Sequence, residues 1–238
     1  MSAVIHIWSE NFRRSLFILL ILSYGLAQSQ SLIPEKRTRD FKPSILKLSY
    51  DVIPLCVTMV SDKKTRQGFQ AAMDFDQFFF AVEYGTESTV RGETFEYTND
   101  GYHFSFGPEI NMLKNSTNGN ALTFGFRYGQ ANFNETLSYI QSDTSFFGQT
   151  MINARNPELV ARWLELTLGI QANVWKNLYL GYTVRYKVFR SVKGIEEFAP
   201  YDVPGFGLYE DNNGVRFNFY VGWAIPLREK YPEEPLTD

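Results

Sequence analysis

The amino-acid sequence predicts an all-β protein, an eight-stranded antiparallel up-and-down transmembrane β-barrel of the outer-membrane type. Apolar and polar residues alternate along most of the chain from Ser44 onward, which is the period of a strand with two different faces. Aromatic residues make up 16% of the chain, a content that suits strands and membrane interfaces. Short and long connections also alternate along the chain, as in barrels with tight turns at one end and longer loops at the other.

The amino-terminal segment has the organisation of a secretory signal peptide. Arg13 and Arg14 precede the apolar run SLFILLILSYGLA, which ends with small residues at cleavage spacing. The alternative is a membrane-anchor helix, but the run is shorter than the roughly 20 residues that span a bilayer. We therefore expect a signal peptide at 1–27, a flexible periplasmic leader at 28–43, a β-barrel domain at 44–228 and a C-terminal tail at 229–238.

The strands are bounded by turn-forming residues. Tight turns are predicted at 74–77, 114–120 and 176–177, and an intermediate connection at 61–67. Long loops are predicted at 88–100, 134–160 and 191–213. The eight strands are expected at 45–60, 67–75, 78–87, 101–113, 121–133, 161–175, 178–190 and 214–227.

The two faces of these strands differ in composition. One carries Phe, Tyr, Leu, Ile and Val, and the other carries Gly, Ala, Thr and Asn with single charges. The interior of a narrow barrel needs small residues, whereas glycines would only weaken a solvent-exposed face. An Arg or Lys facing lipid near the midplane costs about 2–4 kcal/mol. The polar face is therefore predicted to line the lumen. A soluble lipocalin-type barrel would instead have an outer face rich in Lys and Glu, which this sequence lacks.

Two similar segments place opposite charges on that inner face. FFFAVEYG (78–85) contains Glu83, and LTFGFRYG (122–129) contains Arg127. A pair between them would reach across the strand at 101–113. An eight-stranded interior is about wide enough for side chains to fill, which favours a sealed, charge-paired core over a narrow pore. The predicted interior charge network is Glu83, Glu109, Arg127, Glu165, Arg185 and Arg216.

Composition excludes several function classes. The net charge of −3 provides no basic field for nucleic acid, and no nucleic-acid partner is expected. The single cysteine, Cys56, excludes an intramolecular disulfide and a cysteine-based zinc site. We expect no metal and no cofactor.

His103 and Ser105 are the weak candidates for catalysis. Their His-x-Ser spacing is that of outer-membrane lipid A deacylases, and Glu109 shares their face. Residues two apart on a strand share a face, so His103 could activate Ser105 as a nucleophile. Both are predicted to point into the lumen, away from lipid chains. We therefore expect His103 to be an interior hydrogen-bonding residue and keep a lipid-modifying enzyme as the alternative.

The segment PYDVPGFG (200–207) is the most distinctive loop sequence. Its prolines and glycines restrict the backbone, and its aromatic side chains can pack. We expect a folded cap over the barrel mouth, with a surface-binding loop as the alternative. The residues concerned are Tyr201, Asp202, Pro204, Gly205, Phe206 and Gly207.

From about Ser44 to Leu227 the chain resembles a family of uncharacterised small outer-membrane β-barrel proteins of Gram-negative bacteria. The likeness is carried by FFFAVEYGTE (78–87), GYHFSFGPEIN (101–111), LTFGFRYGQANF (122–133), WLELTLGIQANVWKNLYLGYTVRYK (163–187) and PYDVPGFG (200–207). The resemblance implies the fold and the location, and it implies no activity. The carboxyl terminus departs from outer-membrane barrels that end on an aromatic strand residue, because REKYPEEPLTD follows the last strand.

Taken together, these patterns predict a non-enzymatic protein of the outer membrane of a Gram-negative bacterium. We expect both ends in the periplasm and a structural or surface-interaction role. The expected partners are outer-membrane lipid and, during biogenesis, the barrel-assembly machinery. A narrow pore is the transport alternative. The sequence names no specific ligand or protein partner.

Overall fold

The computed structural model describes residues 41–61, 63–92, 95–113, 119–142, 149–210 and 213–228. The predicted signal peptide, most of the predicted leader and the C-terminal tail lie outside these ranges. The described elements are β1 (Ile45–Asp51), α2 (Val52–Val60), β2 (Lys64–Phe75), β3 (Phe78–Arg91), β4 (Phe95–Asn111), β5 (Ala121–Ser142), β6 (Gln149–Trp175), β7 (Leu178–Lys193), β8 (Asp202–Val203), β9 (Gly207–Leu208) and β10 (Asn213–Pro226).

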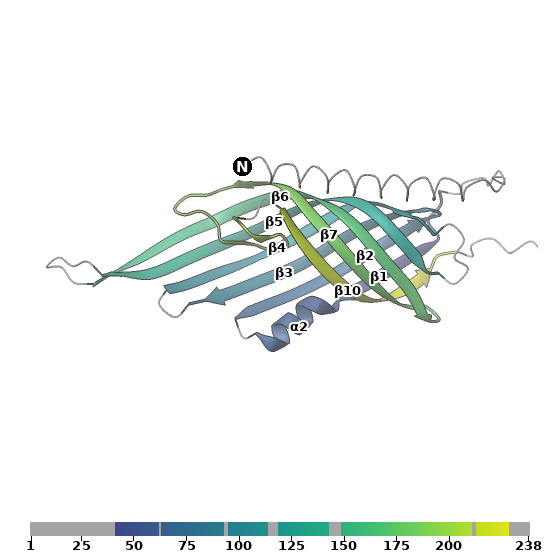
Figure 1. Ribbon diagram of the computed structural model, residues 1–238, viewed down its shortest axis with the longest axis horizontal. Coiled ribbons are helices and arrows are strands. Elements are labelled where there is room, and N and C mark those ends of the chain that lie inside the picture. The colour runs from purple at the N-terminus through teal and green to yellow at the C-terminus, as the bar shows by residue number, and fades with distance from the viewer. Residues whose placement is uncertain are drawn as a thin grey trace, which may run out of the picture. The chain divides into compact units, whose positions relative to one another are not determined.

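Eight of these strands close into a barrel in the order β1-β10-β7-β6-β5-β4-β3-β2 (Figure 1). Every neighbouring pair is antiparallel, and β10 completes the ring by pairing with β1. The short strands β8 and β9 pair only with each other, in the connection between β7 and β10. The predicted all-β, antiparallel, up-and-down barrel is therefore confirmed.

The prediction of one strand over 45–60 is wrong, because β1 ends at Asp51 and helix α2 follows it. The Asp51 carboxylate caps the helix by accepting a hydrogen bond from the backbone N–H of Ile53 at 3.2 Å. Pro54 occupies the first helical turn, where its missing N–H removes no intrahelical hydrogen bond. These local signals override the β-branched composition of the segment. Within the described ranges, no helix is long and apolar enough to cross a membrane.

The prediction of long loops at 88–100 and 134–160 is also wrong over most of both ranges. β3 continues to Arg91, and β5 and β6 stay paired from Ala121 opposite Gln171 to Ser142 opposite Gln149. Beyond the barrel both faces of this β5–β6 hairpin are partly exposed, so apolar alternation fades. The backbone hydrogen bonds between β5 and β6 nevertheless continue, because they do not depend on an apolar alternation of side chains.

Side chains alternate between a buried inner face and an exposed outer face along the barrel strands. The outer face forms an apolar belt to which every barrel strand contributes side chains that are 37–58% exposed. The apolar belt consists of Leu48, Phe69, Phe80, Val82, Tyr84, Tyr102, Phe106, Ile110, Phe124, Phe126, Leu166, Leu168, Ile170, Tyr182, Tyr186, Val215, Phe217, Phe219, Val221, Trp223 and Ile225.

Glycines on the inner face leave space for long side chains from neighbouring strands. A Cβ added at Gly129 would lie 2.3 Å from Cε2 of Trp163, and one at Gly125 would lie 2.5 Å from Cγ of Glu109. Both separations are shorter than non-bonded carbon atoms tolerate. The small residues of the polar face thus allow an indole and a carboxylate to fill the lumen.

Candidate functional site

Three carboxylates and three cations form a central network across the lumen, and each is at most 4% exposed. They come from five different strands, because every second residue of a strand points inward. The central network consists of Glu83 on β3, Glu109 on β4, Arg127 on β5, Glu165 on β6, and Arg185 and Lys187 on β7.

Arg127 bridges two of these carboxylates. Its Nε donates to Oε1 of Glu109 at 3.0 Å, and its Nη2 contacts the same oxygen. Its Nη1 lies 3.5 Å from Oε2 of Glu83. The side chain reaches Glu83 across the inner face of β4, where Gly107 lies against the Arg127 backbone without a side chain of its own. The expected contact between Glu83 and Arg127 is present, but Glu109 is the closer partner.

Arg185 connects the remaining members. Its Nη2 contacts both Glu83 and the hydroxyl of Tyr220, and its Nη1 lies 3.5 Å from Oε2 of Glu165. The Tyr220 hydroxyl donates to Oε2 of Glu83 at 2.8 Å, and Lys187 Nζ lies 3.6 Å from Oε1 of Glu165. The sequence prediction left out Tyr220, although the two-residue period from Asn218 places it inside.

A second cluster surrounds Glu87, which the prediction omitted although it lies four residues after Glu83 on the same face. Its carboxylate is 3.0 Å from Lys64 Nζ, 2.5 Å from Arg66 Nη2 and 3.7 Å from Arg216 Nη2. The ion pair of Arg216 is therefore with Glu87, and not with the carboxylates of the central network.

His103 and Ser105 both point into the lumen, as their position on the strand predicts. His103 Nε2 lies 3.9 Å from Oε1 of Glu83. The Ser105 hydroxyl is 1% exposed and has no hydrogen-bond partner among the described residues, so no bond joins it to His103. This arrangement lacks the nucleophile–base hydrogen bond that activates a serine.

The 200–207 segment packs inside the barrel mouth as a plug. Val203 and Phe206 are at most 4% exposed and join an apolar cluster with inward residues of β5 and β6. The Phe206 ring lies edge-on to Trp163, with centroids 5.8 Å apart. Gly205 has a positive φ of 77°, which turns the plug between β8 and β9. Of the loop candidates, Tyr201 remains 44% exposed, where its hydroxyl accepts a hydrogen bond from Arg91.

Polar contacts tie the plug to the barrel wall. Asp202 forms an ion pair with Lys64 at 2.6 Å, and its carbonyl accepts a hydrogen bond from Asn99 at 2.6 Å. The Gly205 carbonyl accepts a hydrogen bond from Lys187 of the central network. The plug therefore connects the two charge clusters to the strands around them.

Glu135, beyond the belt on β5, holds the start of the plug. Its Oε1 accepts hydrogen bonds from the Tyr97 hydroxyl at 2.5 Å, from Asn99 at 3.1 Å and from the Tyr201 backbone N–H at 3.2 Å. Burial raises the pKa of the Glu135 carboxyl above its ordinary value, against the opposing effect of these hydrogen bonds. Burial and the adjacent Glu135 charge raise the pKa of the Tyr97 hydroxyl.

Three further side chains lie together at the end of the lumen opposite the plug. Lys47 on β1 donates to Oε1 of Gln171 at 2.6 Å. Its Nζ lies 4.6 Å from the ring centroid of Phe79 and 5.4 Å from that of Tyr179, and all three side chains are buried or nearly so. Within the described part of the chain, no group of three or more His, Cys, Asp or Glu side chains could hold a metal ion.

Comparison with known proteins finds a matching family and similar solved structures. The crystal structure of CarO from Acinetobacter baumannii aligns with a TM-score of 0.39 and 10% sequence identity, over 78% of this chain and 99% of CarO. No curated protein sequence matches. The model of a domain of unknown function, DUF6048, matches residues 10–230. The chain belongs to the DUF6048 family.

Proposed function

We propose that this protein is an integral β-barrel of the Gram-negative outer membrane, with a sealed polar interior and a structural or surface-interaction role. The apolar belt is the observation that carries the proposal. All eight barrel strands contribute to it, whereas the largest exposed apolar patch of a soluble monomer is typically a few hundred Å². In a closed barrel in the membrane, the apolar outer face of the strands contacts lipid, and the charged inner face is kept away from lipid in the lumen.

The lumen holds three successive layers of side chains, which support a sealed interior. Lys47, Phe79 and Tyr179 fill one end, the central network crosses the middle, and the plug fills the other end. An eight-stranded barrel is about wide enough for its side chains to fill. We infer that the resting barrel does not conduct ions.

The β5–β6 hairpin supports the surface-interaction role. β4 pairs with β5 only up to Tyr139, and β7 pairs with β6 only up to Val160, so the hairpin extends past both neighbours (Figure 1). Ile140 and Met151 lie opposite each other on it and are 57% and 63% exposed. An exposed apolar pair on a projecting hairpin is a suitable contact point for another molecule.

Membrane fractionation of a Gram-negative host tests the location. We expect the protein in the outer-membrane fraction, with a folded band that changes mobility on an electrophoresis gel after boiling. Recovery in the soluble periplasmic fraction would refute the proposal.

Planar-bilayer recording tests the seal separately. The purified barrel should give no current steps above those of a non-inserting control protein. Regular conductance steps from the heat-modifiable form would show a pore and leave the membrane location intact.

A further inference from the structure

One side of the barrel wall lacks a strand near the plugged end. β1 ends at Asp51 opposite Tyr220, so Asn213–Phe219 of β10 have no β1 partner. On the other side β1 pairs with β2 only as far as Phe69, which leaves Lys64–Gly68 of β2 unpaired by β1. Among the described strands, none fills this interval. We define the interval between these two segments as the wall gap.

Helix α2 covers the wall gap and binds both of its edges. The Asp51 carboxylate at its start accepts hydrogen bonds from the backbone N–H of Phe219, at 3.2 Å, and from the side chain of Asn218. Thr58 Oγ accepts from the backbone N–H of Arg66 at 2.8 Å on the β2 edge. Open sheet edges do not occur in contact with lipid, so these side chains replace part of the missing ladder.

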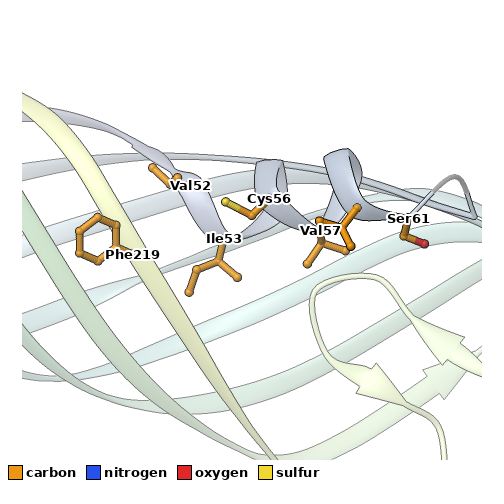
Figure 2. A pocket seen from close by; sticks show the side chains of 7 residues that line it. Val52, Ile53, Cys56, Val57, Ser61 and Phe219 are labelled. Carbon is orange, nitrogen blue, oxygen red and sulfur yellow. The ribbon is translucent and has the colours of Figure 1, made fainter.

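An apolar groove of about 530 Å³ runs along α2 beside β10. Its helix residues recur at i, i+1, i+4, i+5 and i+8, which places them on one face. Figure 2 shows this face of the helix with the ring of Phe219 beside it. In the part of the chain that the structure describes, the groove is lined by apolar side chains and one serine: Val52, Ile53, Cys56, Val57, Val60, Ser61 and Phe219.

A basic pocket of about 570 Å³ adjoins the groove, because Ser61 lines both. Among the described residues, the charged side chains that line it are those of Lys63, Lys64 and Arg91. Lys64 is paired with Glu87 and Asp202, while Lys63 is exposed. The Arg91 guanidinium lies over the Tyr201 ring, 5.2 Å from its centroid, and donates to the Tyr201 hydroxyl at 2.9 Å, which uses one of its five N–H donors. Lys63 and Arg91 can therefore receive an anion at the end of the apolar groove.

We propose that the groove and the basic pocket together bind one acidic lipid of the surrounding leaflet. The acyl chain lies along α2 against Phe219, and the anionic headgroup lies between Lys63 and Arg91. Nine helical residues rise about 13 Å, enough for a substantial part of one acyl chain. Phe219, which lines the groove, belongs to the apolar belt, whereas Lys64, which lines the basic pocket, pairs with Asp202 of the plug. The headgroup therefore lies nearer to the plugged end than the acyl chain does, as in a lipid of that leaflet. The inference rests on the proposed membrane location.

Native mass spectrometry of the full barrel released from nanodiscs tests the headgroup site. The protein is reconstituted with equal amounts of phosphatidylglycerol and phosphatidylcholine, and retained lipid is counted. The parent should retain one phosphatidylglycerol in preference to phosphatidylcholine. The Lys63→Gln/Arg91→Gln variant should lose about tenfold of that preference, since it removes two charge-assisted contacts. The control Arg162→Gln/Lys176→Gln removes two exposed cations that line neither pocket and should keep the preference.

Cys56→Trp tests the groove, because the exposed Cys56 lines it and the larger indole would fill it. Met59→Trp is the matched control, because Met59 is an exposed position on the same helix that does not line the groove. Cys56→Trp should lower retention of the lipid about tenfold, and Met59→Trp should not. The inference would be overturned if the parent retained both lipids equally. It would also be overturned if the Lys63→Gln/Arg91→Gln variant or Cys56→Trp changed lipid retention no more than its own control. Each variant is first checked for the heat-dependent gel shift, and its absence from the parent would instead refute the proposed membrane location.

Discussion

Removing one charge from the centre of the barrel should unbalance the whole central network. Arg127→Met leaves three carboxylates facing two cations, and it leaves Glu109 without its main partner. The aliphatic part of Met replaces most of the volume of the arginine stem. The substitution therefore mainly removes the positive charge, and buried Glu109 has little access to water that could solvate it instead.

The magnitude follows from burial. Glu109 is 4% exposed, and removing one partner of a buried ion pair costs roughly 3–5 kcal/mol because the other charge stays desolvated. Arg127→Met/Glu109→Gln restores the balance of two carboxylates and two cations, and should recover most of that loss. Arg127→Met/Glu83→Gln should recover less, because Glu83 also binds Arg185 and Tyr220, which then lose a partner.

Urea unfolding of the barrel refolded in lipid vesicles measures these differences, with the heat-dependent gel shift as the readout of folded fraction. The control Arg162→Met removes an exposed arginine and should change the free energy of unfolding by less than about 0.5 kcal/mol. The reasoning fails if Arg127→Met costs less than about 1 kcal/mol, or if the Glu109 double variant is no more stable than Arg127→Met alone.

Three further changes test the plug and the helix. Gly205→Val places a β-branched residue at a positive φ, with its Cβ only 2.4 Å from His103 Cγ, and should displace the plug. The Phe206 amide, which donates to the Val203 carbonyl at 2.9 Å, should then exchange its hydrogen faster than in the parent, and unchanged exchange would contradict the packing. Because the pKa of Glu135 is raised in the folded protein, protonation of Glu135 stabilises the folded plug. This stabilisation is fully present below the ordinary pKa of 4.5, and it is lost as the pH rises through the raised pKa of the folded state. Hydrogen exchange of the Tyr201 amide should therefore speed up with pH beyond its intrinsic rate in the parent and follow the intrinsic rate in Glu135→Gln; identical pH profiles would refute this. Asp51→Ala removes the cap of α2 and the acceptor of the Phe219 N–H, and should lower the free energy of unfolding by about 1–2 kcal/mol, while Asp51→Asn, which keeps an acceptor, should cost less in the same urea titration.

The residues of β3 show how far sequence reasoning reaches. A strand repeats every two residues, so placing Glu83 inside also places Phe79, Ala81 and Glu87 inside and Phe80 outside. The choice between faces follows from composition, because glycines and single charges suit a narrow lumen. Both steps are local in the chain, and they were enough to predict the barrel.

Helix α2 shows where local signals were misjudged. The Asp51 cap and Pro54 were readable in the sequence, but the β-branched composition of the segment favoured a strand. The helix is retained because two edges, at Arg66 and Phe219, supply backbone groups that its side chains satisfy. These backbone groups need hydrogen-bond partners because β1 ends before its two neighbours do, and the sequence alone does not show where β1 ends.

By itself the sequence determined the fold class, the inward and outward face of most strand residues, and many of the charges that share the lumen, because all of these depend on a two-residue period and on composition. Only the tertiary structure decided which charges meet. Arg216 pairs with Glu87, and Arg127 pairs more closely with Glu109 than with Glu83, because long side chains reach the partners that ring order and register bring within a few ångströms. The plug and the wall gap likewise depend on contacts between segments far apart in the chain, which no local period encodes.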